Sequence, residues 1–147
     1  MKVILQEITK GQDEVIIRYK QMTDKINDIV RYVEGHGGKL MGTKDGQQFA
    51  IKPYQVIYLE SVEGSTYLYT ENEVYRSSLT LTAAERIYAE EGYFRCSKSM
   101  VINIYRIQKL QSMPENRIDV TMDNEEHVVI SRRYAKELRN ILRGEWR

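Results

Sequence analysis

The first 20 residues contain two short apolar segments separated by a polar one. Segments 2–8 and 14–20 are rich in Val, Ile and Tyr, which predicts two β-strands joined by a turn at residues 10–13. After Thr23, which can cap a helix, the apolar positions recur with a helical period. These positions are Ile26, Ile29, Val30 and Val33, and glycines 35, 37 and 38 follow them. We therefore expect a β-β-α element over residues 1–37.

From residue 39 onward, short apolar segments alternate with turn residues. The pair Asp45-Gly46, between segments 40–43 and 47–51, is a strong hairpin signal. Further strands are expected over residues 56–61, 66–70, 74–77, 94–96, 100–102, 107–113, 117–122 and 127–130. Helical spacing appears only in 81–90 and in 132–143, where Ser131 can act as the cap. The pattern predicts an α+β fold that is mostly antiparallel β.

Length and composition fit one soluble globular domain, or one domain with a short appended element. The chain has 147 residues, of which 41% are hydrophobic and 29% charged. No apolar run reaches the length of about 18 residues that a membrane span requires, and Met1 begins a β-like segment instead of a signal peptide. We therefore expect a cytoplasmic protein.

The charged residues are distributed unevenly, although the formal net charge is only +1. Residues 41–91 contain 4 basic and 8 acidic side chains, whereas residues 92–147 contain 11 and 7. The small net charge argues at first against a nucleic-acid partner, because phosphate binding usually accompanies a basic excess. The basic excess is present, but it is confined to the last third of the chain.

Motifs for an enzyme or a metalloprotein are absent from the sequence. It contains no Gly-rich phosphate loop, no Gly-x-Ser-x-Gly elbow and no His-Glu-x-x-His pattern. No spacing links Cys96 to His36 or His127 as a nucleophile pair, and one cysteine with two histidines provides too few ligands for a structural zinc site. We expect neither enzymatic activity nor a metal or other cofactor.

Two polar segments in the basic third remain as candidates for function. Residues 95–99 precede an apolar strand, and Ser131-Arg132-Arg133 precede the last helix. Arg and Lys side chains donate hydrogen bonds to guanine edges and phosphates, and hydroxyl groups add backbone contacts. Composition alone supports two interpretations equally. The two segments contact DNA, or they are only a solvated hairpin loop and a solvated helix start.

Three segments in a fixed order resemble the LytTR family of bacterial DNA-binding domains. They are Val56-Ile-Tyr-Leu-Glu-Ser61, Tyr93-Phe-Arg-Cys-Ser-Lys-Ser-Met-Val-Ile-Asn103 and Val129-Ile-Ser-Arg-Arg133. The resemblance covers roughly residues 38–143, so we assign residues 38–147 to a LytTR-type domain. It implies an antiparallel β fold with short helices, which regulates transcription by inserting loops into successive major grooves of promoter DNA.

The resemblance also implies which residues contact DNA. The first loop falls at residues 63–66 with Thr66 at its tip, and Asn103 is expected to support the second loop. The second loop provides Arg95, Ser97, Lys98 and Ser99, and the third provides Arg132 and Arg133. Lys98 and Arg133 are expected at base edges, and Arg95 and Arg132 at phosphates. Many relatives have His in place of Ser97 and a bulkier side chain in place of Thr66.

The 37 residues before position 38 are too few for the receiver domain that many family members carry. We therefore expect a stand-alone regulator on promoter direct repeats. Its β-β-α element is a candidate for homodimerisation or for contact with a partner such as a membrane protein, or its helix packs on the same domain. The alternative function is a protein-interaction or signalling module with reduced DNA binding. Cys96, beside the second loop, is either redox-sensitive or a buried structural thiol.

Overall fold

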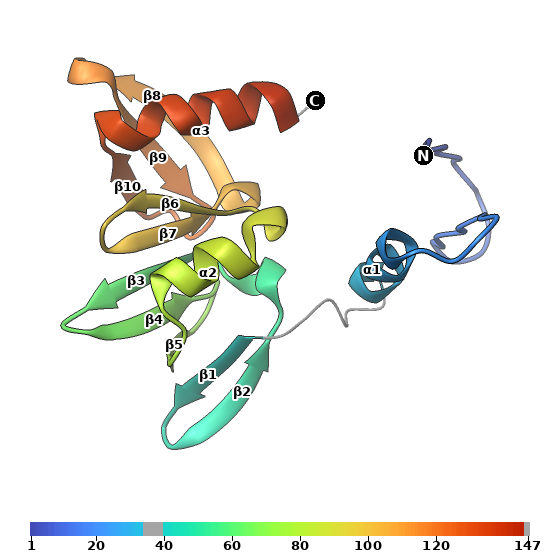
Figure 1. Ribbon diagram of the computed structural model, residues 1–147, viewed down its shortest axis with the longest axis horizontal. Helices are drawn as coiled ribbons and strands as arrows, with labels where there is room; N and C mark the ends of the chain where they lie inside the picture. Colours follow the sequence, from blue (N-terminus) through green and yellow to red (C-terminus); the bar gives the residue numbers. More distant parts are fainter. Residues whose placement is uncertain (34–39, 146–147) are drawn as a thin grey trace. The chain divides into compact units, whose positions relative to one another are not determined.

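The computed structural model describes residues 1–33 and 40–145, and the chain divides into two compact units, Met1–Gly37 and Gly38–Arg147 (Figure 1). The first unit contains helix α1 (Asp24–Val33). Thr23 caps this helix as predicted, because its Oγ1 accepts a hydrogen bond from the Ile26 amide at 3.3 Å. The glycines and His36 that follow α1 lie outside the described residues.

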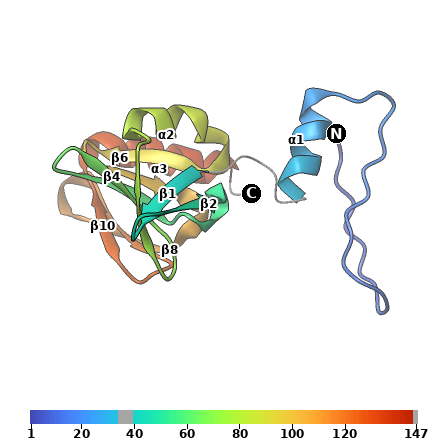
Figure 2. The same cartoon turned by 90° about the horizontal axis from the view of Figure 1, so that it is seen from below.

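The prediction of two strands within the first unit is wrong. Residues 2–8 and 14–20 have no strand assignment, and Figure 2 shows the segment before α1 as a long loop that folds back on itself. Its apolar side chains are exposed apart from the half-buried Ile17, and Leu5 reaches 92%. An isolated pair of strands is marginally stable in water unless one face packs against another element. High β-propensity at these residues is therefore not sufficient for a sheet.

The second unit contains a seven-stranded antiparallel sheet with the order β2-β1-β5-β4-β3-β7-β6. The strands are β1 (Leu40–Lys44), β2 (Gln47–Ile51), β3 (Tyr58–Val62), β4 (Ser65–Tyr69), β5 (Val74–Ser77), β6 (Tyr93–Ser97) and β7 (Met100–Asn103). The predicted hairpin at Asp45-Gly46 is confirmed. Both residues have positive φ, 51° and 75°, as a two-residue type I′ turn requires.

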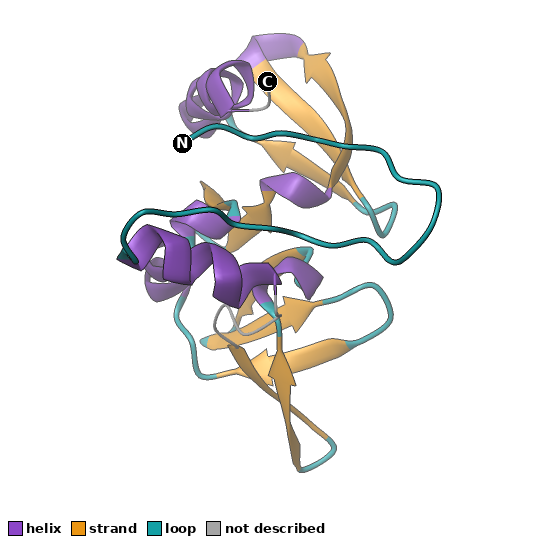
Figure 3. Ribbon diagram, turned by 90° about the vertical axis from the view of Figure 1, so that its right-hand side faces the viewer, coloured by secondary structure: helices purple, strands orange, loops and turns teal. Residues whose placement is uncertain are grey.

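A three-stranded antiparallel sheet, with the order β10-β9-β8, completes the β structure. Its strands, β8 (Ile107–Met113), β9 (Arg117–Met122) and β10 (His127–Ile130), have the predicted bounds. The helices are α2 (Leu81–Ile87) and α3 (Arg132–Glu145), and the 3₁₀ turns are η1 (Pro53–Gln55), η2 (Ala89–Glu91), η3 (Ile104–Arg106) and η4 (Pro114–Asn116). Strands dominate this unit, as Figure 3 shows, so the predicted fold class is confirmed. No helix among the described residues is long and apolar enough to cross a membrane.

Strands β3, β6 and β7 are buried on both faces. Successive side chains of a strand point to opposite sides of the sheet, so each of these strands contributes residues to two cores. Phe94, Cys96 and Ile102 pack with the three-stranded sheet and with Ala135 and Leu138 of α3. The alternate residues of the same strands, Leu59, Tyr93 and Val101, pack into a second core that α2 covers. The turn between β6 and β7 therefore projects from the most deeply buried part of the unit.

We expect Gly92→Ala to destabilise the protein more than Gly46→Ala. Both glycines have positive φ, which costs alanine about 1 to 2 kcal/mol. A Cβ at Gly46 would have no neighbour within 4 Å, whereas at Gly92 it would lie 2.5 Å from the Tyr105 ring. Overpacking should therefore cost Gly92→Ala about 1 to 3 kcal/mol more. Urea unfolding of both variants measures the difference, and equal losses of stability would contradict it.

Candidate nucleic-acid interface

The turn between β6 and β7 is held by the side chain of Arg95. Its Nε donates to the Ser97 carbonyl oxygen and its Nη2 to the Lys98 carbonyl oxygen, both at 2.6 Å. The Ser99 amide donates to the Ser97 Oγ at 3.2 Å, which closes the turn further. Lys98 is exposed at the tip. The turn therefore presents a lysine on a backbone that is already ordered.

A backbone hydrogen bond joins this turn to the hairpin of β3 and β4. The Ser61 amide donates to the Ser99 carbonyl oxygen at 2.8 Å, beyond the last paired residues of β3 and β7. The β3–β4 turn consists of Glu63 and Gly64, whose φ values are 50° and 81°. The two turns thus lie at the same edge of the large sheet, at the left in Figure 1.

The first turn of α3 lies on the same side of the second unit (Figure 1). The helix begins after Ser131, whose carbonyl oxygen accepts hydrogen bonds from the amides of Tyr134 and Ala135. Arg132 and Arg133 are exposed, and the first turn contains no acidic residue. The helix dipole and two guanidinium groups make this end of α3 suitable for an anion.

The prediction that Thr66 lies at the tip of the first loop is wrong. The hairpin closes at the pair Val62–Ser65, so Thr66 is already the second residue of β4. Its side chain is 8% exposed. The exposed tip is Glu63-Gly64, and the Glu63 carboxylate would repel phosphate. The β3–β4 hairpin therefore supports the β6–β7 turn through Ser61 but has no basic side chain at its own tip.

Asn103 does not support the second loop, contrary to expectation. It is 1% exposed and lies at the end of β7 that is remote from residues 97–99. Its Nδ2 donates to the Val56 carbonyl oxygen at 3.0 Å, and its Oδ1 accepts from the Tyr105 amide at 3.1 Å. The side chain thereby caps η3 and fixes the segment that enters β3.

Arg95 also differs from its expected role as a direct phosphate contact. Its side chain is 20% exposed, two of its donor atoms hold the turn, and its Nη1 lies 3.9 Å from Glu85 Oε2. Arg95 is therefore a positioning residue for Lys98. Sequence reasoning missed the supporting roles of Ser61 and Glu85, because no local pattern reveals contacts between residues so distant along the chain.

Two further residues considered in the sequence, Cys96 and His127, have partners within the fold. Burial raises the pKa of the Cys96 thiol to about 12, and its Sγ donates to the Met100 carbonyl oxygen at 3.5 Å. His127 Nδ1 lies 3.0 Å from Asp119 Oδ2 on the neighbouring strand. Both side chains therefore have structural partners within the fold.

Comparison with known families and proteins identifies the same part of the chain. A family described as the LytTr DNA-binding domain matches residues 46–143. A solved LytTr DNA-binding domain from Bacillus cereus superposes with a TM-score of 0.67 at 23% identity, over 71% of this chain and 96% of that one. At this identity, the structural likeness establishes the fold.

Curated relatives with two different descriptions match the chain. The sensory transduction protein LytT of Bacillus anthracis is 30% identical over 88 residues, which are 60% of this chain and 36% of that protein. The chain thus matches about a third of that relative's length. A protein of Staphylococcus aureus described as an uncharacterized HTH-type transcriptional regulator is 26% identical over 128 residues, which are 86% of each chain.

We expect Cys96 to be unreactive in the folded protein. A thiol with a pKa near 12 is protonated at neutral pH, and the thiolate is the reactive form. Iodoacetamide should therefore modify native protein very slowly, from pH 7 up to about pH 9, and modify it fully only in denaturant. Ser112→Cys, which places a thiol at an exposed position of β8, is the control for access. Equal rates for Cys96 and the introduced cysteine would contradict the prediction.

Proposed function

Because the chain belongs to the LytTR family of DNA-binding domains, we propose that it regulates transcription by binding double-stranded promoter DNA at specific sequences. The observation that carries this proposal is a pair of exposed basic residues, Lys98 in the β6–β7 turn and Arg133 in the first turn of α3, two elements that lie on one side of the second unit. The description of the Staphylococcus aureus relative as a transcriptional regulator supports it.

In the proposed complex, Lys98 and Arg133 contact base edges in successive major grooves. Both side chains can donate to O6 and N7 of guanine, the commonest specific contact in protein–DNA complexes. Arg132 and the first turn of α3 bind phosphate, which sets the position of the protein on the duplex. Ser97 and Ser99 add hydroxyl groups beside Lys98.

Pre-organisation of the second loop supports specific binding by a protein of low net charge. Arg95 and Ser61 already hold the turn, so less conformational entropy is lost when DNA binds. The formal charge of +1 limits attraction to arbitrary DNA, which depends on phosphate neutralisation. A fixed arrangement of a few donors favours specific sites over random ones.

The first unit provides a surface for a second copy of the chain. Before α1 it exposes a set of large apolar side chains: Val3, Ile4, Leu5, Ile8, Val15, Ile16, Tyr19 and Met22. Exposed apolar groups gathered in one segment are typical of an association surface. We propose that this segment pairs with its copy in a homodimer, which would bring two DNA-binding units to one promoter.

Arg133→Ala should remove sequence discrimination at one base pair. The loss of a bidentate contact to guanine should reduce the preference for that base by about 1 to 3 kcal/mol. The measurement is binding to a selected duplex and to its single-base variants. Arg86→Ala, which removes an exposed arginine from α2, is the matched control and should keep the preference. An Arg133→Ala protein with unchanged base preference would refute the assignment.

The dimer can be tested with the full-length chain. Sedimentation equilibrium should give twice the 17.3 kDa mass for the wild type and the monomer mass for the double variant Leu5→Gln, Ile16→Gln. Val129→Gln, which changes an apolar side chain of β10 that is 49% exposed, should remain dimeric. A monomeric wild type would exclude the homodimer and leave the segment for another partner, such as a membrane protein.

A further inference from the structure

Helix α3 carries a row of basic residues that continues beyond the arginines of its first turn. Arg132, Lys136, Arg139 and Arg143 are spaced by four, three and four residues. With 3.6 residues per turn, these positions fall within an arc of roughly 60°, and they extend over about 16 Å of the helix axis. We call these four residues the α3 basic row.

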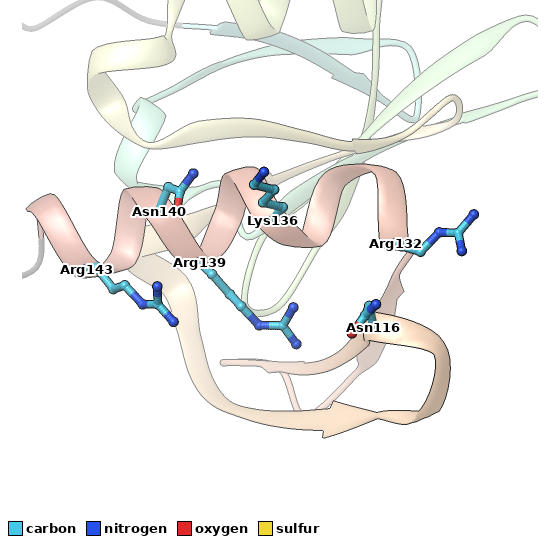
Figure 4. Close-up of a pocket in the computed structure, with 6 residues that line it drawn as sticks. All are labelled: Asn116, Arg132, Lys136, Arg139, Asn140 and Arg143. Carbon is cyan, nitrogen blue, oxygen red and sulfur yellow. The ribbon is translucent and has the colours of Figure 1, made fainter.

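The α3 basic row borders a hollow of about 390 Å³ between α3 and the turn that joins β8 to β9. The described residues that line it are Asn116, Arg132, Lys136, Arg139, Asn140 and Arg143. Figure 4 shows Arg139 and Arg143 on the side of α3 that faces the β8–β9 hairpin, and Arg132 beside Asn116. Every one of these side chains can donate hydrogen bonds and none is acidic.

The four cations are not neutralised within the part of the chain that the structure describes. None of them forms an ion pair there. Each successive pair in the row is three or four residues apart, which is the spacing at which like charges on a helix repel each other. An anion bound from outside the chain would relieve this repulsion, so the free protein already favours such a ligand.

We propose that the α3 basic row binds the phosphate backbone of duplex DNA that flanks the sequence contacted by the turns. This inference rests on the proposed function. Arg132 belongs both to the first turn of α3 and to the hollow, so the two surfaces are continuous. Guanidinium groups bind phosphate through two parallel hydrogen bonds, and one strand of B-DNA presents a phosphate about every 3.4 Å along its axis. A segment about 16 Å long can therefore contact several phosphates.

The position of α3 defines which DNA the row can contact. The helix runs from the edge that carries the turns across the second unit, so Arg139 and Arg143 lie farther from that edge than Arg132 (Figure 1). The duplex that reaches them is therefore the flank and not the sequence contacted by the turns. The row therefore affects affinity and the length of the site, while Lys98 and Arg133 determine base preference.

The double variant Arg139→Gln, Arg143→Gln tests this inference in the full-length protein. On a selected site with flanks of about one helical turn, roughly 10 base pairs, the slope of log K against log salt concentration should fall in magnitude by about 2. On the same site without flanks, and in base preference, the variant should match the wild type. Arg86→Gln, Lys109→Gln removes the same charge from exposed positions elsewhere in the second unit and should leave both slopes unchanged.

Thermal unfolding provides the check on folding. The variant should have a stability close to that of the wild type, because the relief of like-charge repulsion offsets the loss of Arg143 from the last turn of the helix. If the variant keeps the wild-type slope on the flanked site and still binds selectively, this inference is wrong while the proposed function stands. The row would then be left for an acidic protein partner. A wild-type protein that binds selected and random duplexes equally overturns the proposed function as well.

Discussion

The burial of three strands on both faces is the constraint on which the second unit depends. Strands β3, β6 and β7 send alternate side chains into two cores, one under α2 and one shared with α3 and the small sheet. A shift of register by one residue would exchange the two sets of side chains and misfill both cores. The register is therefore fixed by packing, and the turns at the ends of these strands are fixed with it.

Much of the β structure could be predicted from short-range signals, because segments rich in Val, Ile and Tyr are separated by short polar turns. Asp45-Gly46 defines the first hairpin, and β8, β9 and β10 have the predicted bounds. The same signals failed for the two strands predicted before α1. Residues 2–8 have the composition of a strand, but strand formation depends on a packing surface that composition does not reveal.

The candidate site was predictable in its position but not in the role of each residue. Lys98, Arg132 and Arg133 are exposed as the family resemblance implied. Thr66 is buried, however, and Arg95 uses its guanidinium for carbonyl groups of its own chain. Residue type indicates what a side chain can donate. Whether those donors are available to a ligand depends on contacts that form only in the folded chain, such as those of Arg95 with the carbonyl oxygens of Ser97 and Lys98.

The hydrogen bond between Ser61 and Ser99 links two turns through main-chain atoms alone. A contact of this kind does not depend on the side chains that the two residues carry. A substitution at Lys98, which takes part in the turn only through its carbonyl oxygen, can therefore alter the chemical group offered to the outside while the geometry of the edge stays constant. Such a scaffold permits new recognition sequences to evolve by single replacements, without a compensating change in the fold.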